Sequence, residues 1–249
     1  NYDDYQGNYD AYDAAYQAWQ KGQYQQYDQP AGYADGLTDF FYASMAQFLQ
    51  GGGNPTYSPL NVYMAMAMLA ETTGGNSRQQ ILDLFGVDTI EQLREQASHV
   101  WNAHYSDDGE TTMLLANSLW LDEAYAFKKK TSQLLADRYY ASSFHGDLGT
   151  EGMDKQLRTW LNANTGGLLK DQTKNVGLDP QTVFALASTV YFTAGWEGKF
   201  ASSNTKDAVF HALNGDRMTP FMNKTITQYT YYWSDNFGAI ALELTGENR

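Results

Sequence analysis

Histidines are the side chains of this sequence best suited to acid–base chemistry or metal binding, and there are four: His99, His104, His145 and His211. His99 and His104 are five residues apart. That spacing does not place them on one helical face, and no His-Glu-x-x-His motif occurs. We therefore interpret each histidine as a surface or structural residue, and no metal site is predicted.

Other signatures of catalysis are missing from the sequence as well. There is no Gly-x-Ser-x-Gly elbow and no Gly-x-x-x-x-Gly-Lys phosphate loop. The chain has no cysteine, which excludes thiol nucleophiles, thiolate ligands and disulfides. The acidic run Ser106–Glu110 lacks the spaced oxygens of a calcium loop. The sequence predicts no catalytic residue, no enzyme and no cofactor.

The length and charge of the chain limit the number of domains and the kinds of partner to be expected. With 249 residues, 43% of them hydrophobic, the chain can form one large domain with an appendage, or two small domains. A net charge of −13 argues against nucleic acid or an anionic membrane as a bulk partner. The one basic run, Lys128–Lys130, is typical of a solvated helix face.

No apolar run reaches the 18 residues of a transmembrane helix, and no signal-peptide pattern occurs. Because the chain begins at Asn1, we expect an upstream segment.

Residues 1–36 differ in composition from the rest of the chain. Aromatic residues recur there at alternating steps of three and four, which favours one stripe of a helix: Tyr2, Tyr5, Tyr9, Tyr12, Tyr16 and Trp19. Gly7 interrupts the pattern. Two interpretations stay open, an amphipathic helix packing on the domain or on a partner, and a low-complexity tether. Composition also suggests adhesion to carbohydrate or cell wall.

The stretch Asn54–Leu69 predicts a buried helix. Ser58 suits the N-cap and Pro59 the first helical position, and the following residues are apolar apart from Asn61. A helix that is apolar on all sides belongs in the middle of a large domain. Asn61 then needs partners that are distant in sequence, because an unpaired buried amide costs about 1–3 kcal/mol.

Helical patterns dominate the first two thirds of the chain, and strand patterns follow. Further helices are expected from Thr38, with Phe41, Met45, Phe48 and Leu49 on one face; from a capping box at Ser77–Gln80; over Ile90–Tyr105; over Phe127–Tyr139; and around Leu157, Trp160 and Leu161. Buried strands are expected at Thr111–Leu121 and Val183–Thr193, and shorter ones at Ala208–Leu213, Met218–Lys224, Ile226–Trp233 and Ala239–Leu244. This order indicates an α+β domain.

Several segments, taken in order, resemble the serpin family of serine protease inhibitors. They are Asn54 with Ser58-Pro59 and the buried helix, Ala116–Trp120, Trp160 with Thr165–Leu169, Phe184–Phe192 leading to Gly195–Phe200, and Met218–Met222. The resemblance covers Leu37–Leu244, so residues 1–36 form a tyrosine-rich extension and 37–249 the N-terminal part of a serpin domain.

The resemblance implies a metastable fold of three β-sheets with eight or nine helices, here its N-terminal two thirds. In inhibitory serpins a target protease cuts an exposed reactive loop, which then inserts into the large sheet as a new strand. The acyl-enzyme is dragged along and distorted. The family pattern continues past Leu244 into the reactive loop, so the reactive bond is not in this chain. We expect residues 1–249 not to fold stably alone, the remaining serpin segment being separate or missing.

Residue by residue, the resemblance assigns two regions. The shutter, where the large sheet parts, is matched by Asn54, Ser58, Pro59, Asn61, Thr165, Gly167 and Ser188. Trp196 matches the tryptophan of the breach, where insertion begins. Asn61 and Ser188 depart from the family pattern, which has Ser and Asn in those places, and the exchange preserves a hydrogen bond if the two side chains meet. Arg158 also replaces a common Asn.

The resemblance leaves three functions open. The first is suicide inhibition of serine or cysteine proteases, outside the cell or at its surface. The second is a non-inhibitory serpin acting as carrier, chaperone or structural protein. The third is a serpin carried as cargo on an aromatic surface-anchoring segment. Heparin is not expected as a partner, because the helix Ile90–Tyr105 sets only Arg94 against Glu91 and Glu95.

Overall fold

The structure, a computed structural model, describes residues 29–51, 55–107, 111–227 and 230–245. The chain divides into two compact units. Unit 1 comprises Asn1–Ser106 and Met113–Tyr191, and unit 2 comprises Asp107–Thr112 and Phe192–Arg249. The predicted aromatic stripe in the first residues lies outside the described part of the chain, and so does Asn54.

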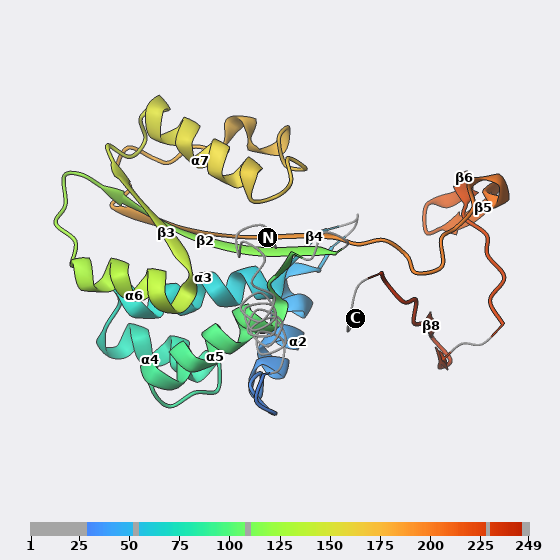
Figure 1. The fold of residues 1–249 in the computed structure, drawn as a ribbon, viewed down its shortest axis with the longest axis horizontal. Helices are drawn as coiled ribbons and strands as arrows, with labels where there is room; N and C mark the ends of the chain where they lie inside the picture. The colour runs from blue at the N-terminus through green and yellow to red at the C-terminus, as the bar shows by residue number, and fades with distance from the viewer. Residues whose placement is uncertain (1–28, 52–54, 108–110, 228–229, 246–249) are drawn as a thin grey trace, which may run out of the picture. The chain divides into compact units, whose positions relative to one another are not determined.

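A four-stranded sheet forms the middle layer of unit 1 (Figure 1). Its central strand, β2 (Thr112–Asp122), pairs with β1 (Ser106–Asp107), with β4 (Phe184–Thr193) and, in parallel, with β3 (Ala141–Gly146). The strand predicted at Thr111–Leu121 is thereby confirmed.

Helices cover both faces of this sheet (Figure 1). One face carries α2 (Leu37–Phe48), α3 (Pro59–Thr72), α4 (Gly75–Leu84), α5 (Ile90–His104) and α6 (Lys129–Tyr139). The other face carries α7 (Glu151–Ala163) and the short 3-10 helix η2 (Gln172–Asn175).

Each strand supplies two cores, because successive side chains of a strand point to opposite faces. From β2, Leu119 packs in the core shared with α2 to α6, whereas Trp120 packs in the core under α7. From β4, Leu186 joins the first core and Ala185 the second. This layering confirms the α+β prediction.

Two expected helix details are wrong. The predicted capping box Ser77–Gln80 does not open α4, which has already begun at Gly75 without a side-chain cap. The capping box lies instead at Thr89 and Gln92, at the start of α5. In α2 the buried face is offset from the predicted one: Leu37, Phe40 and Ser44 are buried, while Phe48 and Leu49 are exposed. The helix faces the core through the stripe that begins at Leu37.

The strands also differ from expectation. β3 was not predicted, since its sequence Ala-Ser-Ser-Phe-His-Gly has little apolar alternation, and only Ala141 is fully buried. β4 was expected to be a buried strand, but most of its residues are half-buried and Thr189 is the one fully buried residue of the strand.

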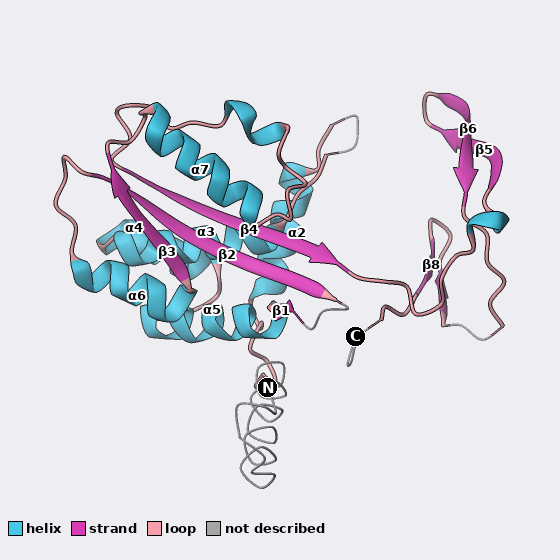
Figure 2. Cartoon of the chain, turned by 45° about the horizontal axis from the view of Figure 1, so that its top comes forward, coloured by secondary structure: helices cyan, strands magenta, loops and turns pink. Residues whose placement is uncertain are grey.

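Unit 2 is built from two hairpins (Figure 2). β5 (Lys206–Ala212) pairs antiparallel with β6 (Gly215–Phe221), and β7 (Tyr231–Trp233) pairs antiparallel with β8 (Gly238–Ile240). Gly215 has a φ of 108°, which the tight turn between β5 and β6 requires and L side chains rarely adopt. The last two strands are shorter than the predicted Ile226–Trp233 and Ala239–Leu244.

Candidate functional site

The site begins at the N-terminus of α3. The Ser58 side chain accepts a hydrogen bond from the backbone N–H of Asn61 at 3.4 Å, and Pro59 occupies the first turn. Both features follow from the local sequence, because the proline has no N–H to leave unpaired and the hydroxyl caps a free one. The cap places the Asn61 side chain one turn into a largely buried helix.

Asn61 connects this helix to the sheet. Its Nδ2 donates a hydrogen bond to Ser188 Oγ of β4 at 3.3 Å, across 127 positions of sequence. Ser188 lies on the same face of β4 as Phe184 and Leu186, which pack against the apolar core. The contact is therefore a polar link between α3 and β4 at the border of an otherwise apolar layer.

The turn after α7 approaches β4 from the opposite face. Thr165 is 4% exposed, and its hydroxyl donates to Leu161 O at 2.8 Å. The Gly167 N–H donates to Asn162 O at 2.9 Å, with a Gly167 φ of 74°. Both predicted residues thus shape the turn itself.

The direct contact of this turn with β4 is made by Gly166, which sequence reasoning did not select. A Cβ added at Gly166 would lie 2.5 Å from the Tyr191 ring, whereas one added at Gly167 meets nothing within 4 Å. The missing side chain lets the backbone of the turn lie against the strand. The adjacent glycines Gly166 and Gly167 marked the turn in the sequence, but the sequence could not indicate which of them contacts β4.

Thr189, next to Ser188, faces the α7 side of β4. Its Oγ1 is buried and has no hydrogen-bond partner within the described residues. Buried polar atoms are normally paired, so Thr189 is an unusual polar position on the α7 face of β4.

Trp196 lies in unit 2, three residues beyond β4. It forms a β-bridge with Leu244, and backbone hydrogen bonds from Glu197 N to Glu243 O and from Thr245 N to Gly195 O, at 3.1 and 2.8 Å, hold the two segments together. Its ring meets the Phe200 ring edge-on at 6.1 Å. The Trp196 side chain is 40% exposed.

Two carboxylates flank this bridge. Glu197 is hydrogen-bonded to the Glu243 side chain, which raises the pKa of Glu197 above its ordinary value, and the negative charge of Glu243 adds to the effect. Lys224 acts in the opposite direction. The Lys224 Nζ also donates to Gly198 O at 2.6 Å.

The structure brings together Ser58, Pro59, Asn61 and Ser188, and it places Thr165 and Gly167 in the turn against the other face of β4. Arg158, the further departure, donates from Nη1 to Val176 O at 3.1 Å and ties α7 to the segment that precedes β4. Asn54 lies outside the described residues.

The structure contains a buried ion pair that the sequence did not predict. Glu71, at the end of α3, accepts two hydrogen bonds from Arg94 of α5, each at 2.8 Å, and a third from Tyr139 OH of α6 at 2.9 Å. The Glu71 side chain is 3% exposed. Burial raises the pKa of the Tyr139 hydroxyl, and hydrogen bonding to Glu71 raises that of Arg94. The sequence did contain a signal for this ion pair, because Glu71 is a single acidic residue near the end of an apolar helix.

The histidines lie on three elements: His99 and His104 on α5, His145 on β3 and His211 on β5. His99 contacts Gln29 Oε1 at 2.7 Å, and His211 contacts Asp216 at 2.8 Å. The described residues contain no cluster of three or more His, Asp or Glu side chains able to hold a metal. None of the helices in that part of the chain has the length and apolar character of a membrane span.

One edge of β4 is open. Of the strands that the structure describes, β4 pairs only with β2, so the backbone N–H and C=O groups along its other edge have no strand partner. Such an edge accepts a further strand. The polar contacts of Asn61, Ser188 and the Gly166 turn lie on the strand that carries this edge.

Comparison with known proteins identifies a family that matches most of this chain. The family model described as Serpin (serine protease inhibitor) matches residues 37–249. Serpin-ZX of Arabidopsis thaliana is 28% identical over 203 residues, which is 79% of this chain and 52% of that protein. Serpin-ZXA of Oryza sativa is 28% identical over 198 residues, 77% of this chain and 50% of that protein. The chain spans about half the length of these relatives.

Solved structures are similar in fold. Arabidopsis AtSerpin1 in its native stressed conformation matches with a TM-score of 0.74 at 23% identity, covering 88% of this chain and 58% of that one. Tengpin, a thermophilic serpin, in its latent state matches with a TM-score of 0.76 at 22% identity, covering 87% of this chain and 57% of that one. Since the family model covers most of the sequence, this chain belongs to the serpin family.

Proposed function

We propose that this chain is the scaffold of an inhibitor of serine proteases that works by taking up its cleaved reactive loop as a strand beside β4. The open edge of β4 is the observation that carries the proposal. A strand added there would pair the exposed backbone groups, which is the general chemistry of strand addition. The shutter and breach roles suggested for the named residues are part of this proposal.

The polar contacts of β4 support movement of the strand. Interlocked apolar side chains resist separation, whereas a hydrogen bond such as the one from Asn61 to Ser188 is broken and remade at low net cost. The Gly166 turn adds a second contact without interdigitated side chains. At these two points, β4 is therefore held by contacts that can break and form again.

The proposal includes partners. The targets would be serine or cysteine proteases, outside the cell or at its surface. A C-terminal serpin segment, in the same or another chain, would cover apolar side chains that unit 2 exposes, among them Phe210 and Trp233. We expect no heparin cofactor, because Arg94, the strong base of α5, is already held by Glu71.

The test mixes the full-length serpin that carries this sequence with trypsin-like, chymotrypsin-like and elastase-like proteases, and looks for a complex that survives SDS. A band at the summed mass of inhibitor and protease supports inhibition. Cleavage by every enzyme without such a complex would rule out the inhibitor and favour a carrier, chaperone or structural role.

A further inference from the structure

A groove runs beside α6 in unit 1. It consists of two adjoining hollows of about 540 and 440 Å³ that share Leu121, Phe127 and Ser132 as lining residues. We call it the α6 groove. One hollow opens over Ala141 and His145 of β3, and the other extends toward the ends of α3 and β4.

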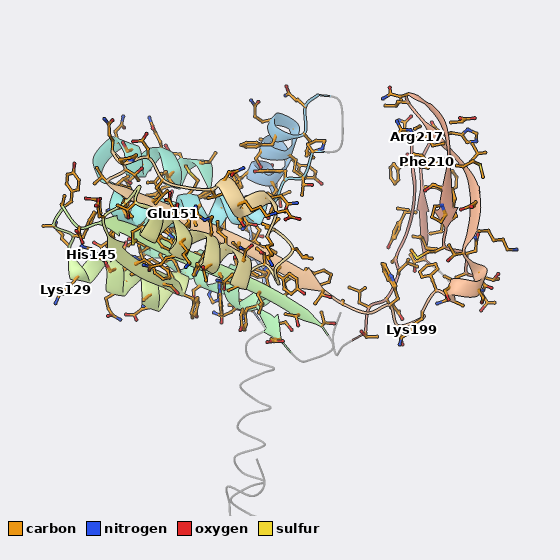
Figure 3. All side chains as sticks on the ribbon, turned by 90° about the horizontal axis from the view of Figure 1, so that it is seen from above. Lys129, His145, Glu151, Lys199, Phe210 and Arg217 are labelled. Carbon is orange, nitrogen blue, oxygen red and sulfur yellow. The ribbon has the colours of Figure 1, made fainter. Side chains whose placement is uncertain are left out.

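The groove combines an apolar floor with a basic rim. Leu121 and Ala141 of the floor are buried. Lys128 and Lys129 line the rim and are exposed, and neither ammonium group has an ion pair or hydrogen bond with another residue of the described part of the chain. Figure 3 shows Lys129 and His145 at the same end of unit 1, one on α6 and one on β3.

Two further charged groups line the groove. Arg78 is fixed there by hydrogen bonds to Ala70 O at 2.9 Å and to Thr73 O. The Glu71 carboxylate is already paired with Arg94. The free charge along the described lining is therefore positive, in a chain whose net charge is −13.

The N-terminal segment of the same chain has the complementary chemistry. Residues 1–28 contain five aspartates and one lysine, a net charge of −4, together with seven tyrosines and one tryptophan. Aromatic side chains fill apolar hollows and bury about 150–250 Å² each. An acidic, tyrosine-rich peptide thus matches both the floor and the rim of the α6 groove.

The chain is long enough to reach. The described part begins at Gln29, which contacts His99 of α5 at 2.7 Å, and α5 packs beside α6. Twenty-eight residues reach as far as roughly 90 Å when extended at about 3.3 Å each. A tethered segment also has an effective concentration in the millimolar range, so that modest affinity suffices.

We propose that residues 1–28 dock in the α6 groove, with tyrosine side chains on the apolar floor and aspartates beside Lys128 and Lys129. This docking would give the tyrosine-rich extension a role on the serpin body, and it does not depend on protease inhibition. The proposal commits to the chain's own N-terminal segment as the occupant.

The first experiment uses the full-length serpin from which residues 1–28 have been removed, with a synthetic peptide of residues 1–28 as the probe. Titration calorimetry should show saturable one-to-one binding that weakens as salt rises from 50 to 500 mM. The untruncated protein should bind the added peptide at least about tenfold more weakly, because its own segment occupies the groove. Equal binding to both proteins would overturn the proposal.

Charge reversal then locates the site. Lys128→Glu with Lys129→Glu in the truncated protein should weaken peptide binding about tenfold or more. The matched control, Lys155→Glu with Lys170→Glu, reverses two exposed lysines that do not line the groove and should leave affinity unchanged. Equal losses in both variants would show nonspecific attraction, and no loss in either would place the segment elsewhere. Both results refute docking in the α6 groove.

Discussion

At the scale of single residues, the exchange between Asn61 and Ser188 gives the sharpest prediction. Ser188→Ala removes the acceptor of the 3.3 Å hydrogen bond and should lower the free energy of unfolding by about 1 kcal/mol. The double variant Asn61→Ser with Ser188→Asn restores a donor and an acceptor in swapped places. It should recover most of that loss in urea unfolding of the full-length protein. If the double variant loses as much stability as the single variants Asn61→Ser and Ser188→Asn lose together, the pair does not act as a unit.

Gly166 and Gly167 form a natural matched pair. Both have positive φ, at 57° and 74°, so alanine at either position costs about 1–2 kcal/mol in backbone strain. Gly166→Ala adds the clash with the Tyr191 ring and should cost a further 1–3 kcal/mol or so. Thermal unfolding of the two variants measures the difference. Equal destabilisation would mean that the turn does not press against β4.

The residues predicted from sequence were those whose role is local. Ser58 and Pro59 follow from helix-cap chemistry, and Asn61 stood out as the lone amide in an apolar helix. Gly166 and Tyr191 are 25 positions apart, and no local pattern marks their contact. Thr189 is polar within a predicted strand, which does not reveal that its hydroxyl would be buried without a partner among the described residues.

At the scale of elements, Glu71 and Arg94 join α3 to α5. Arg94→Met leaves a buried carboxylate without its cation and should lower the free energy of unfolding by about 3 kcal/mol. The control is Glu91→Gln, which removes a 70% exposed partner of the same arginine and should cost below about 1 kcal/mol. Comparable losses in urea unfolding would show that the Glu71 contact is not the dominant one.

The segments around the Trp196 bridge should respond to pH. Hydrogen bonding to Glu243 raises the pKa of Glu197, so the folded state holds this proton more tightly than the unfolded state. The stabilisation is present at acidic pH and lost as pH rises through the folded pKa. Hydrogen exchange at Glu197 N and Thr245 N, corrected for intrinsic pH dependence, should be slower at pH 4 than at pH 7.

Glu243→Gln should remove most of this pH dependence, because glutamine has neither the carboxylate nor the negative charge that raise the pKa of Glu197. Asp216→Asn is the control, since Asp216 is an exposed carboxylate of β6 in the same unit and should leave it intact. An unchanged profile in Glu243→Gln would show that another group is responsible.

The element order was predictable from sequence to a large extent, because long apolar periodicities mark α3, α5 and β2. The failures have physical reasons. β3 is short, and its parallel pairing with β2 rather than its own composition determines its structure. The start of α4 was misplaced because Gly74 and Gly75 resemble a turn, although the helix already begins there.

At the scale of the whole molecule, the strands that the structure describes in unit 1 leave one edge of β4 open, beside polar contacts that can break and form again. A sheet with a free edge is normally a liability for aggregation. In the proposed inhibitor the same edge is the place where a new strand is added, and the hydrogen bonds gained there would stabilise the cleaved form relative to the native one.

Hydrogen–deuterium exchange along β4 before and after proteolytic cleavage of the full-length serpin tests this claim most directly. Strand addition predicts that the β4 amides of Phe184–Thr193 that face the open edge become strongly protected once the loop is cut. Exchange at the β4 amides bonded to β2 should change little. Unchanged exchange at the open edge after complete cleavage would contradict insertion beside β4.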